Sequence, residues 1–147
     1  MKYNSIAVGT DGSDTSLRAV RTAASLAAAY GAKLYVVSAF GSHEGIGAPR
    51  GEDAEIPQIS EDMSQTFLKH AQDVAVEEGA RDVQIIAKAG DPVETMLEVG
   101  KYYKVDLMVV GNKGRNSIQD RVFGSVATEL TRKAHVDVVV ANTSEDR

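Results

Sequence analysis

The sequence predicts an α/β fold in which helices cover both faces of an open parallel sheet. Five short apolar segments alternate with stretches of helical periodicity along the 147 residues. The apolar segments are rich in Val and Ile, which is typical of strands buried on both faces of a parallel sheet. Between these segments lie Gly, Asp-Gly and Asp-Pro sequences, which typically begin or end helices and strands. The predicted order is therefore β-α-β-α-β-α-β-α-β, without an internal repeat, in a single domain spanning 1–147.

The predicted elements follow one another closely in most of the chain. In order, we expect a strand at 6–10, a helix between Ser13 and Gly31, a strand at 34–38, a helix between Ser60 and Gly79, a strand at 83–87, a helix from Asp91-Pro92 to Tyr103, a strand at 106–111, a helix from Gly124-Ser125 to Lys133 and a strand at 136–140. Ser and Asp at the helix starts are typical N-caps, and Pro is typical of a first turn.

Two segments fall outside this alternation. Residues 41–57 are rich in Gly, Pro and charge and are predicted to form a long flexible loop. A loop of this length is unusual in a compact domain, so it is interpreted either as a flap over a site or as a disordered insert. Residues 142–147 are predicted to form a polar tail.

Composition excludes several classes of protein. The formal net charge of −5 argues against binding to nucleic acid, which depends on a basic surface. The chain has no cysteine, so disulfides and cysteine-ligated metals are excluded. No apolar stretch approaches the ~18 residues that span a bilayer, and the first residues carry no signal-peptide pattern. We therefore expect a cytoplasmic protein with neither nucleic acid nor membrane as a partner.

A group of glycines after the fourth predicted strand indicates a phosphate site. Gly111 and Gly114 are separated by two residues, and nine more lie before Gly124-Ser125, which opens a helix. Glycine lets the backbone approach a ligand closely, and a helix N-terminus offers free N–H groups at the positive end of a dipole. Ser125 can donate its hydroxyl and its amide there, or act as a simple N-cap.

Asp11 is the expected partner of this loop. Ligands of open parallel sheets bind at the carboxyl ends of strands, where the strand order reverses. If the first and fourth strands are central neighbours, Asp11 and Gly111 meet at that point and Asp11 can accept from ribose hydroxyls. Asp-Gly is also a common turn former. Lys113 and Arg115 can neutralise phosphate, although each is equally compatible with a solvated loop position.

Signs of catalysis are few. The three histidines, His43, His70 and His135, form no metal-ligand spacing and no nucleophile–base pair. The Gly-x4-Gly-Lys-Ser/Thr pattern of a P-loop is absent. No catalytic residue and no protein metal site is predicted, and Mg²⁺ accompanying ATP would be held mainly by phosphates and water.

In these features the chain resembles the universal stress protein family over essentially its whole length. The resemblance rests on Asp11-Gly12-Ser13 after the first strand, on Gly90-Asp91-Pro92, on the apolar run 106–111, and on the Gly-x2-Gly-x9-Gly-Ser pattern. Each motif alone is weak, but together they stand in the order and spacing of the family. The chain differs from many relatives by having Asp137 in place of proline in its last strand.

The resemblance implies both a fold and a ligand. The fold would be adenine nucleotide alpha hydrolase-like (Rossmann-like), with the strand order 3-2-1-4-5 and helices on both faces. The glycine pattern would place the chain in the subgroup that binds ATP, with Asp11 on the ribose or adenine, backbone groups near Ala39 on the adenine edge, and the glycine loop with Ser125 on the phosphates. The predicted nucleotide-binding residues are Thr10, Asp11, Ala39, Gly111, Asn112, Lys113, Gly114, Arg115, Gly124, Ser125 and Val126.

The last strand indicates a homodimer. An apolar edge strand leaves backbone groups unpaired unless something covers it, and pairing with a second copy about a two-fold axis would cover it. Family members commonly dimerise in this way, so a homodimer through residues 136–141 is expected. The alternative is an edge protected by Asp137 alone.

The leading hypothesis for function is therefore an adenine-nucleotide sensor or reservoir acting in the stress response. The ligand would be ATP, with AMP and cyclic AMP as alternatives, because the pattern specifies a phosphate cradle and not a number of phosphates. Two other functions stay open: a slow ATP hydrolase or nucleotidyl enzyme, with weak ATP hydrolysis at most, and a dimeric interaction module with a structural nucleotide.

Overall fold

Nine elements make up the part of the chain that the computed structural model describes, which is residues 2–41, 59–112 and 124–143. They are β1 (Ser5–Gly9), α1 (Asp14–Tyr30), β2 (Lys33–Phe40), α2 (Glu61–Glu77), β3 (Val83–Ala89), α3 (Pro92–Tyr103), β4 (Leu107–Gly111), α4 (Ser125–Lys133) and β5 (Asp137–Ala141). The predicted strands and helices are all present, and their ends differ from the prediction by a few residues.

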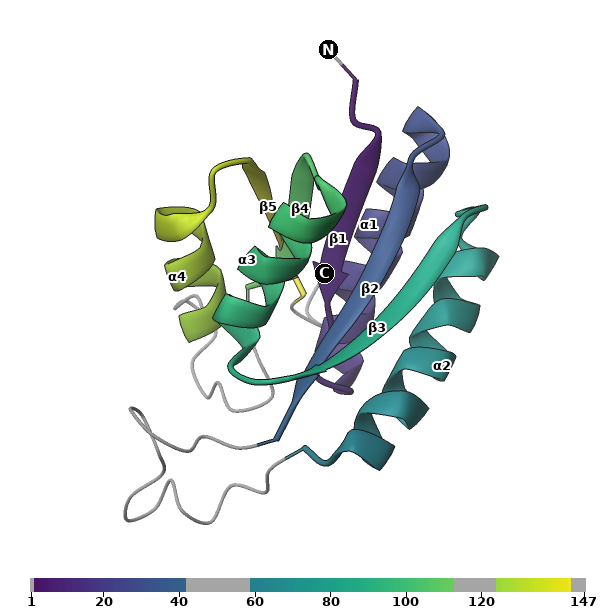
Figure 1. Cartoon of the computed structure of the whole chain (residues 1–147). Coiled ribbons are helices and arrows are strands. Elements are labelled where there is room, and N and C mark those ends of the chain that lie inside the picture. Colours follow the sequence, from purple (N-terminus) through teal and green to yellow (C-terminus); the bar gives the residue numbers. More distant parts are fainter. Residues whose placement is uncertain (1, 42–58, 113–123, 144–147) are drawn as a thin grey trace.

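The five strands form one parallel sheet in the order β3-β2-β1-β4-β5. This is the predicted order. The chain starts in the middle, moves outward to β3 and then crosses to the other side of β1, so the strand order reverses between β1 and β4 (Figure 1). The carboxyl ends of β1 and β4 are therefore neighbours, as the family resemblance implied.

Two helices cover each face of the sheet, because alternate residues of each strand point to opposite sides. Ile6 and Val8 of β1 belong to the apolar cluster that includes residues of α1 and α2. Ala7, between them, belongs to the cluster that includes residues of α3 and α4. Figure 1 shows α1 and α2 behind the sheet and α3 and α4 in front of it. The predicted arrangement, with helices on both faces of the sheet, is confirmed.

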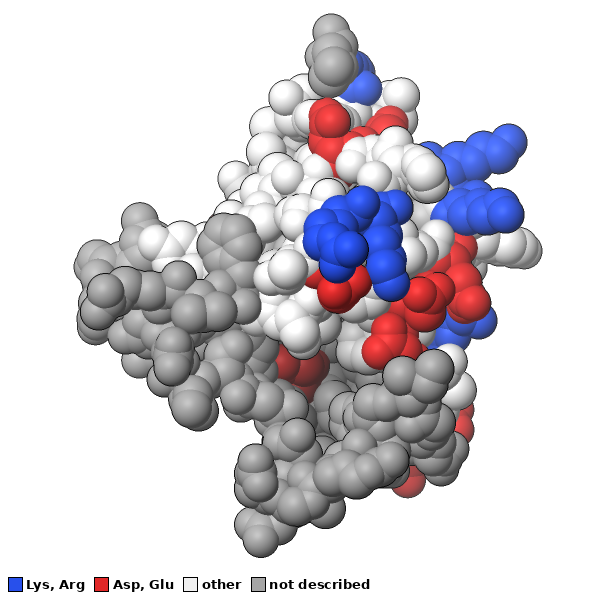
Figure 2. Space-filling model, turned by 90° about the vertical axis from the view of Figure 1, so that its left-hand side faces the viewer, with Lys and Arg blue, Asp and Glu red and all other residues white. Residues whose placement is uncertain are grey.

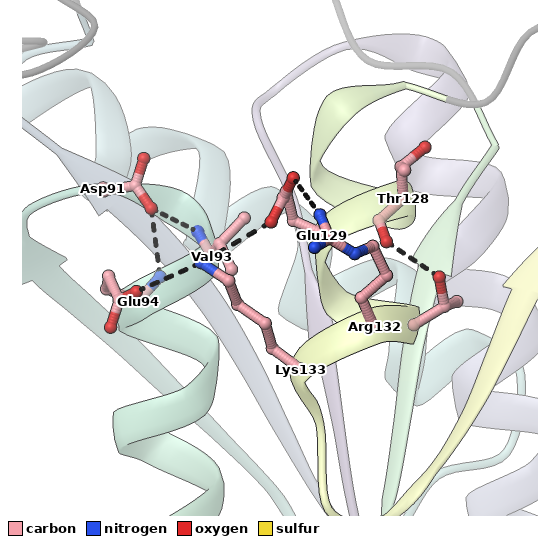
Figure 3. A network of polar contacts seen from close by, with 8 residues as sticks. Asp91, Val93, Glu94, Thr128, Glu129, Arg132 and Lys133 are labelled. Atoms are coloured by element: carbon pink, nitrogen blue, oxygen red, sulfur yellow. Dashed lines mark hydrogen bonds and ion pairs between the residues drawn. The ribbon is translucent and has the colours of Figure 1, made fainter.

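Side chains predicted to cap helices do so. Ser13 accepts from the Ser16 N–H (3.1 Å) at α1, and Ser60 accepts from the Met63 N–H (3.1 Å) at α2. At α3, a single carboxylate oxygen of Asp91 accepts from two backbone N–H groups of the first turn, at 3.0 and 3.1 Å (Figure 3). These bonds satisfy donors that a helix leaves unpaired at its start.

The surface mixes charges of both signs. On the side of the molecule drawn in Figure 2, basic and acidic side chains lie beside one another. Lys133 of α4 is within 3.5 Å of Glu129 and 4.0 Å of Glu94, which links α4 to α3 (Figure 3). Among the helices of the described ranges, none is long and apolar enough to cross a membrane.

Candidate functional site

The candidate site lies at the carboxyl edge of the sheet, where β1 and β4 end side by side. Val8 of β1 pairs with Val109 of β4, so the residues after both strands leave the sheet together. On the other side of β1, the Thr10 N–H donates to the Val37 carbonyl of β2 (2.9 Å). The predicted meeting of the Asp11 and Gly111 segments at the reversal of strand order is therefore present.

The turn between β1 and α1 is held by its own side chains. Oδ1 of Asp11 accepts from the Ser13 N–H (3.0 Å) and from the Ser13 hydroxyl (2.6 Å). The hydroxyls of Thr10 and Ser16 are 2.8 Å apart and buried. Asp11 is therefore the turn former that the sequence allowed, and its role toward a ribose stays a prediction.

Gly12 is required by this turn for two reasons. Its φ of 85° lies in the left-handed region, which side-chain-bearing residues rarely adopt. A Cβ at this position would also overlap the ring of Phe67 from α2. The sequence did not reveal this contact, because the two residues are far apart in the chain.

Ala39 presents its backbone where β1 has already ended. The last β1–β2 pair is Gly9 with Val37, and β2 continues to Phe40. In a parallel strand, alternate residues direct their backbone groups to the same side. Val37 bonds toward β1 through its carbonyl, so Ala39 also faces that side, beyond the end of β1. The backbone groups that the resemblance assigned to an adenine edge therefore lie beside the end of β1, at the carboxyl edge of the sheet.

Asn112 connects three segments at the end of β4. Its N–H donates to the Ala141 carbonyl (2.9 Å), and its carbonyl accepts from the Gly124 N–H (2.8 Å). Its side-chain Oδ1 accepts from the N–H (3.0 Å) and the hydroxyl (2.7 Å) of Thr143. The side-chain Oδ1 of Asn112, a predicted nucleotide-binding residue, is thus bonded within the protein.

Thr143 is a residue that the sequence did not reveal as part of the site. It was predicted to lie in a polar tail, yet it has no exposed surface. The polar composition of the last residues indicated exposure. Its partner Asn112 lies 31 residues away, and no pattern in the sequence links the two.

Helix α4 begins differently from the other helices. Gly124 is its N-cap, with φ −64° and ψ 161°, and in the described part of the chain no side chain caps it. The interpretation of Ser125 as a simple N-cap is therefore wrong, because Ser125 is the first helical residue. The first turns of α1, α2 and α3 each contain an acidic residue, whereas that of α4 contains none. The start of α4, with Ser125 and Val126, is thus suited to an external anion.

Some of the predicted residues cannot be placed. Lys113, Gly114 and Arg115 lie outside the described residues, as do residues 42–57 of the predicted loop. In the described part of the chain, no group of three or more His, Asp or Glu is arranged to hold a metal. A hollow of about 620 Å³ lies against α1, and the predicted nucleotide-binding residues are not among the described residues that line it, which are Asp14, Leu17, Arg18, Arg21, Thr22, His70 and Asn142.

Comparison with known proteins identifies the family. A family model described as the universal stress protein family matches residues 2–142. The chain belongs to the universal stress protein family. Universal stress protein Rv1636 of Mycobacterium tuberculosis is 37% identical over 151 residues, covering 97% of this chain and 98% of the relative.

Solved universal stress proteins have the same fold and include nucleotide complexes. A crystal structure of a universal stress protein in complex with cAMP matches with a TM-score of 0.77 and 35% identity, covering 98% of this chain and 100% of the other. The universal stress protein from Archaeoglobus fulgidus in complex with dAMP matches with a TM-score of 0.67 and 25% identity, covering 95% and 98% of the two chains. Relatives within this family therefore bind adenine nucleotides.

Proposed function

We propose that this universal stress protein binds an adenine nucleotide at the carboxyl edge between β1 and β4 and acts as a regulatory sensor or reservoir. The observation that carries the proposal is the start of α4, which has no acidic residue in its first turn and no capping side chain among the described residues. It is joined directly to the end of β4 by the Gly124–Asn112 bond. The cAMP and dAMP complexes of relatives support an adenine nucleotide as the ligand.

In this proposal, separate groups of residues bind the adenine, the ribose and the phosphate of the nucleotide. The backbone groups of Ala39 lie on β2, past the end of β1, and would bind the adenine edge. Asp11, beside Thr10, would accept from ribose hydroxyls. Gly111, Gly124 and the N–H groups of Ser125 and Val126 would hold phosphate, because unpaired helix amides attract anions.

Lys113, Gly114 and Arg115 complete the phosphate side in this proposal. The two basic side chains would offset phosphate charge, and Gly114 would let the backbone lie close to the ligand. Asn112 contributes by positioning the loop, since its Oδ1 is bonded to Thr143.

Binding without rapid chemistry is the role that the site supports best. The described groups at this edge are hydroxyls, backbone amides and Asp11, whose Oδ1 accepts two bonds from Ser13. ATP is the proposed ligand, with AMP and cyclic AMP as the competing adenine nucleotides. Mg²⁺ would enter with the phosphates of ATP and keep water ligands.

The same proposal includes a cytoplasmic homodimer. β5 is paired with β4 on one side and is the last strand of the sheet on the other. Three of its residues, Val138, Val139 and Val140, are half-buried. A second copy pairing along β5 would satisfy the remaining backbone groups. Light scattering at micromolar concentration should give twice the chain mass, and a monomer mass would overturn the dimer.

Calorimetric titration with ATP, AMP, cyclic AMP and GTP tests the ligand. We expect binding of adenine nucleotides and no comparable binding of GTP. Ser125→Ala removes one hydroxyl donor at the start of α4 and should weaken binding of nucleotides about three- to tenfold, the effect of one hydrogen bond. Thr131→Ala, in the last turn of the same helix, is the matched control and should bind as the wild type does.

Two outcomes would change the proposal. If no adenine nucleotide binds at millimolar concentration, the ligand assignment fails. If ATP is hydrolysed by the wild type above the rate of a Gly114→Ala variant, the slow-hydrolase function replaces the sensor.

A further inference from the structure

Buried Thr143 is hydrogen-bonded to the half-buried Asn112, which directly follows the first glycine of the pattern. Thr143 donates both its N–H (3.0 Å) and its hydroxyl (2.7 Å) to one oxygen of Asn112. Two donors on one oxygen fix the orientation of the amide plane. Thr143 has no exposed surface, so both donors are shielded from water, while the accepting Asn112 is half-buried.

The backbone of Asn112 is hydrogen-bonded to the start of α4. Its carbonyl accepts from the N–H of Gly124 (2.8 Å), and Gly124 is the N-cap. No side chain caps α4, so among the described contacts this backbone bond ties the helix start to the sheet. The direction of the Ser125 and Val126 amides therefore depends on where the Asn112 carbonyl lies.

We infer that Thr143 is a positioning residue for the phosphate end of the nucleotide site, acting through Asn112 on the start of α4. The inference rests on the proposed nucleotide function and extends it to a residue after the last strand. Thr143 does not touch the ligand in this view. Its hydroxyl holds Asn112, Asn112 holds Gly124, and the amides that follow Gly124 bind phosphate.

Thr143→Val tests the inference, because it removes the hydroxyl and keeps the shape of the buried side chain. We expect the Kd for AMP to rise about three- to tenfold, the effect of losing one buried hydrogen bond. The Kd for adenosine, which has no phosphate, should change less than twofold. Thr143→Ser keeps the donor and should restore the affinity for AMP. Equal weakening of AMP and adenosine, or no weakening of AMP, would overturn the inference.

A ligand-independent measurement separates this inference from the function on which it rests. Amide hydrogen exchange, followed by NMR without nucleotide, should be faster at Gly124 in Thr143→Val and unchanged at Ala134, at the far end of α4. Ser64→Ala is the matched control, since it removes a buried hydroxyl bond of 2.9 Å to Ser38 between α2 and β2. It should leave the Gly124 amide unchanged.

The outcomes distinguish the two proposals. If the wild type binds no adenine nucleotide but Gly124 exchanges faster in Thr143→Val, the nucleotide function fails and the positioning contact stands. If Gly124 exchange is unchanged, the positioning role fails whatever the ligand. Thr143→Ala, which also lacks the hydroxyl, takes the same test if Thr143→Val does not fold.

Discussion

Gly12 and Gly31 both adopt the left-handed conformation, with φ of 85° and 67°, but their surroundings differ. A Cβ at Gly31 would meet nothing within 4 Å, whereas one at Gly12 would overlap the Phe67 ring. Asp11-Gly12 was recognisable in the sequence as a turn pair. The contact with Phe67 was not, because it depends on how α2 packs beside α1.

Substitution of these two glycines separates backbone strain from steric overlap. Gly31→Ala should lower the free energy of unfolding by about 1 kcal/mol, the cost of the left-handed conformation for a residue with a Cβ. Gly12→Ala adds overlap with an aromatic ring and should cost roughly 3 kcal/mol or more. Urea unfolding measures both. Equal losses would contradict a steric role for Phe67.

In the candidate site too, the sequence predicted local features but not contacts between residues far apart in the chain. Asp11, Gly111 and Gly124 lie at the edge where their spacing predicted them, because glycine and turn chemistry is local. The bonding of Asn112 and the burial of Thr143 are not local. Their bonds join residues 31 positions apart, so only packing brings them together.

At the scale of elements, the helices were predictable because each start and stop has local chemistry. Ser13, Ser60 and Asp91 cap α1, α2 and α3 as predicted. Helix α4 departs from this pattern, since its N-cap is Gly124 and none of the described side chains caps it. The side-chain acceptors at the starts of α1, α2 and α3 have no described counterpart at α4. Phosphate oxygens bound there would act as the acceptors instead.

The cap of α3 gives a measurable prediction. Asp91→Ala removes an oxygen that accepts two N–H bonds and should lower the free energy of unfolding by about 1 kcal/mol. Asp91→Asn retains a side-chain acceptor and should lose much less. Urea unfolding compares the two variants. A loss in Asp91→Asn as large as in Asp91→Ala would show that the charge, and not the cap, stabilises the helix.

At the scale of the whole molecule, contacts between distant segments tie the sheet together. The Tyr3 hydroxyl donates to Asp137 (2.6 Å), which joins the start of the chain to the first residue of β5, 134 positions away. Asp137 is therefore more than a charge on an edge strand. The hydrogen bond to its carboxylate, with burial and nearby negative charge, raises the pKa of Tyr3 above its usual 10.0.

This contact predicts a pH dependence of stability. Because the pKa of Tyr3 is higher in the folded state, its contribution is fully present below about pH 10 and is lost as the pH rises through the folded value. Above pH 10, the melting temperature of the wild type should fall more steeply than that of Tyr3→Phe. Tyr102→Phe, at a position with 78% exposure, is the control and should follow the wild type. Parallel curves for wild type and Tyr3→Phe would contradict the prediction.

The sequence by itself determined the order of elements, the parallel sheet and the three capped helices, because periodicity, glycine and capping chemistry act over a few residues. It also predicted a ligand site where the first and fourth strands end, on the condition that these strands are neighbours, and the family resemblance implied that condition. The tertiary structure decided that Asn112 is held by Thr143, that Phe67 packs against Gly12 and that Tyr3 bonds Asp137. These contacts form only when distant segments pack, since their geometry depends on the relative placement of whole elements.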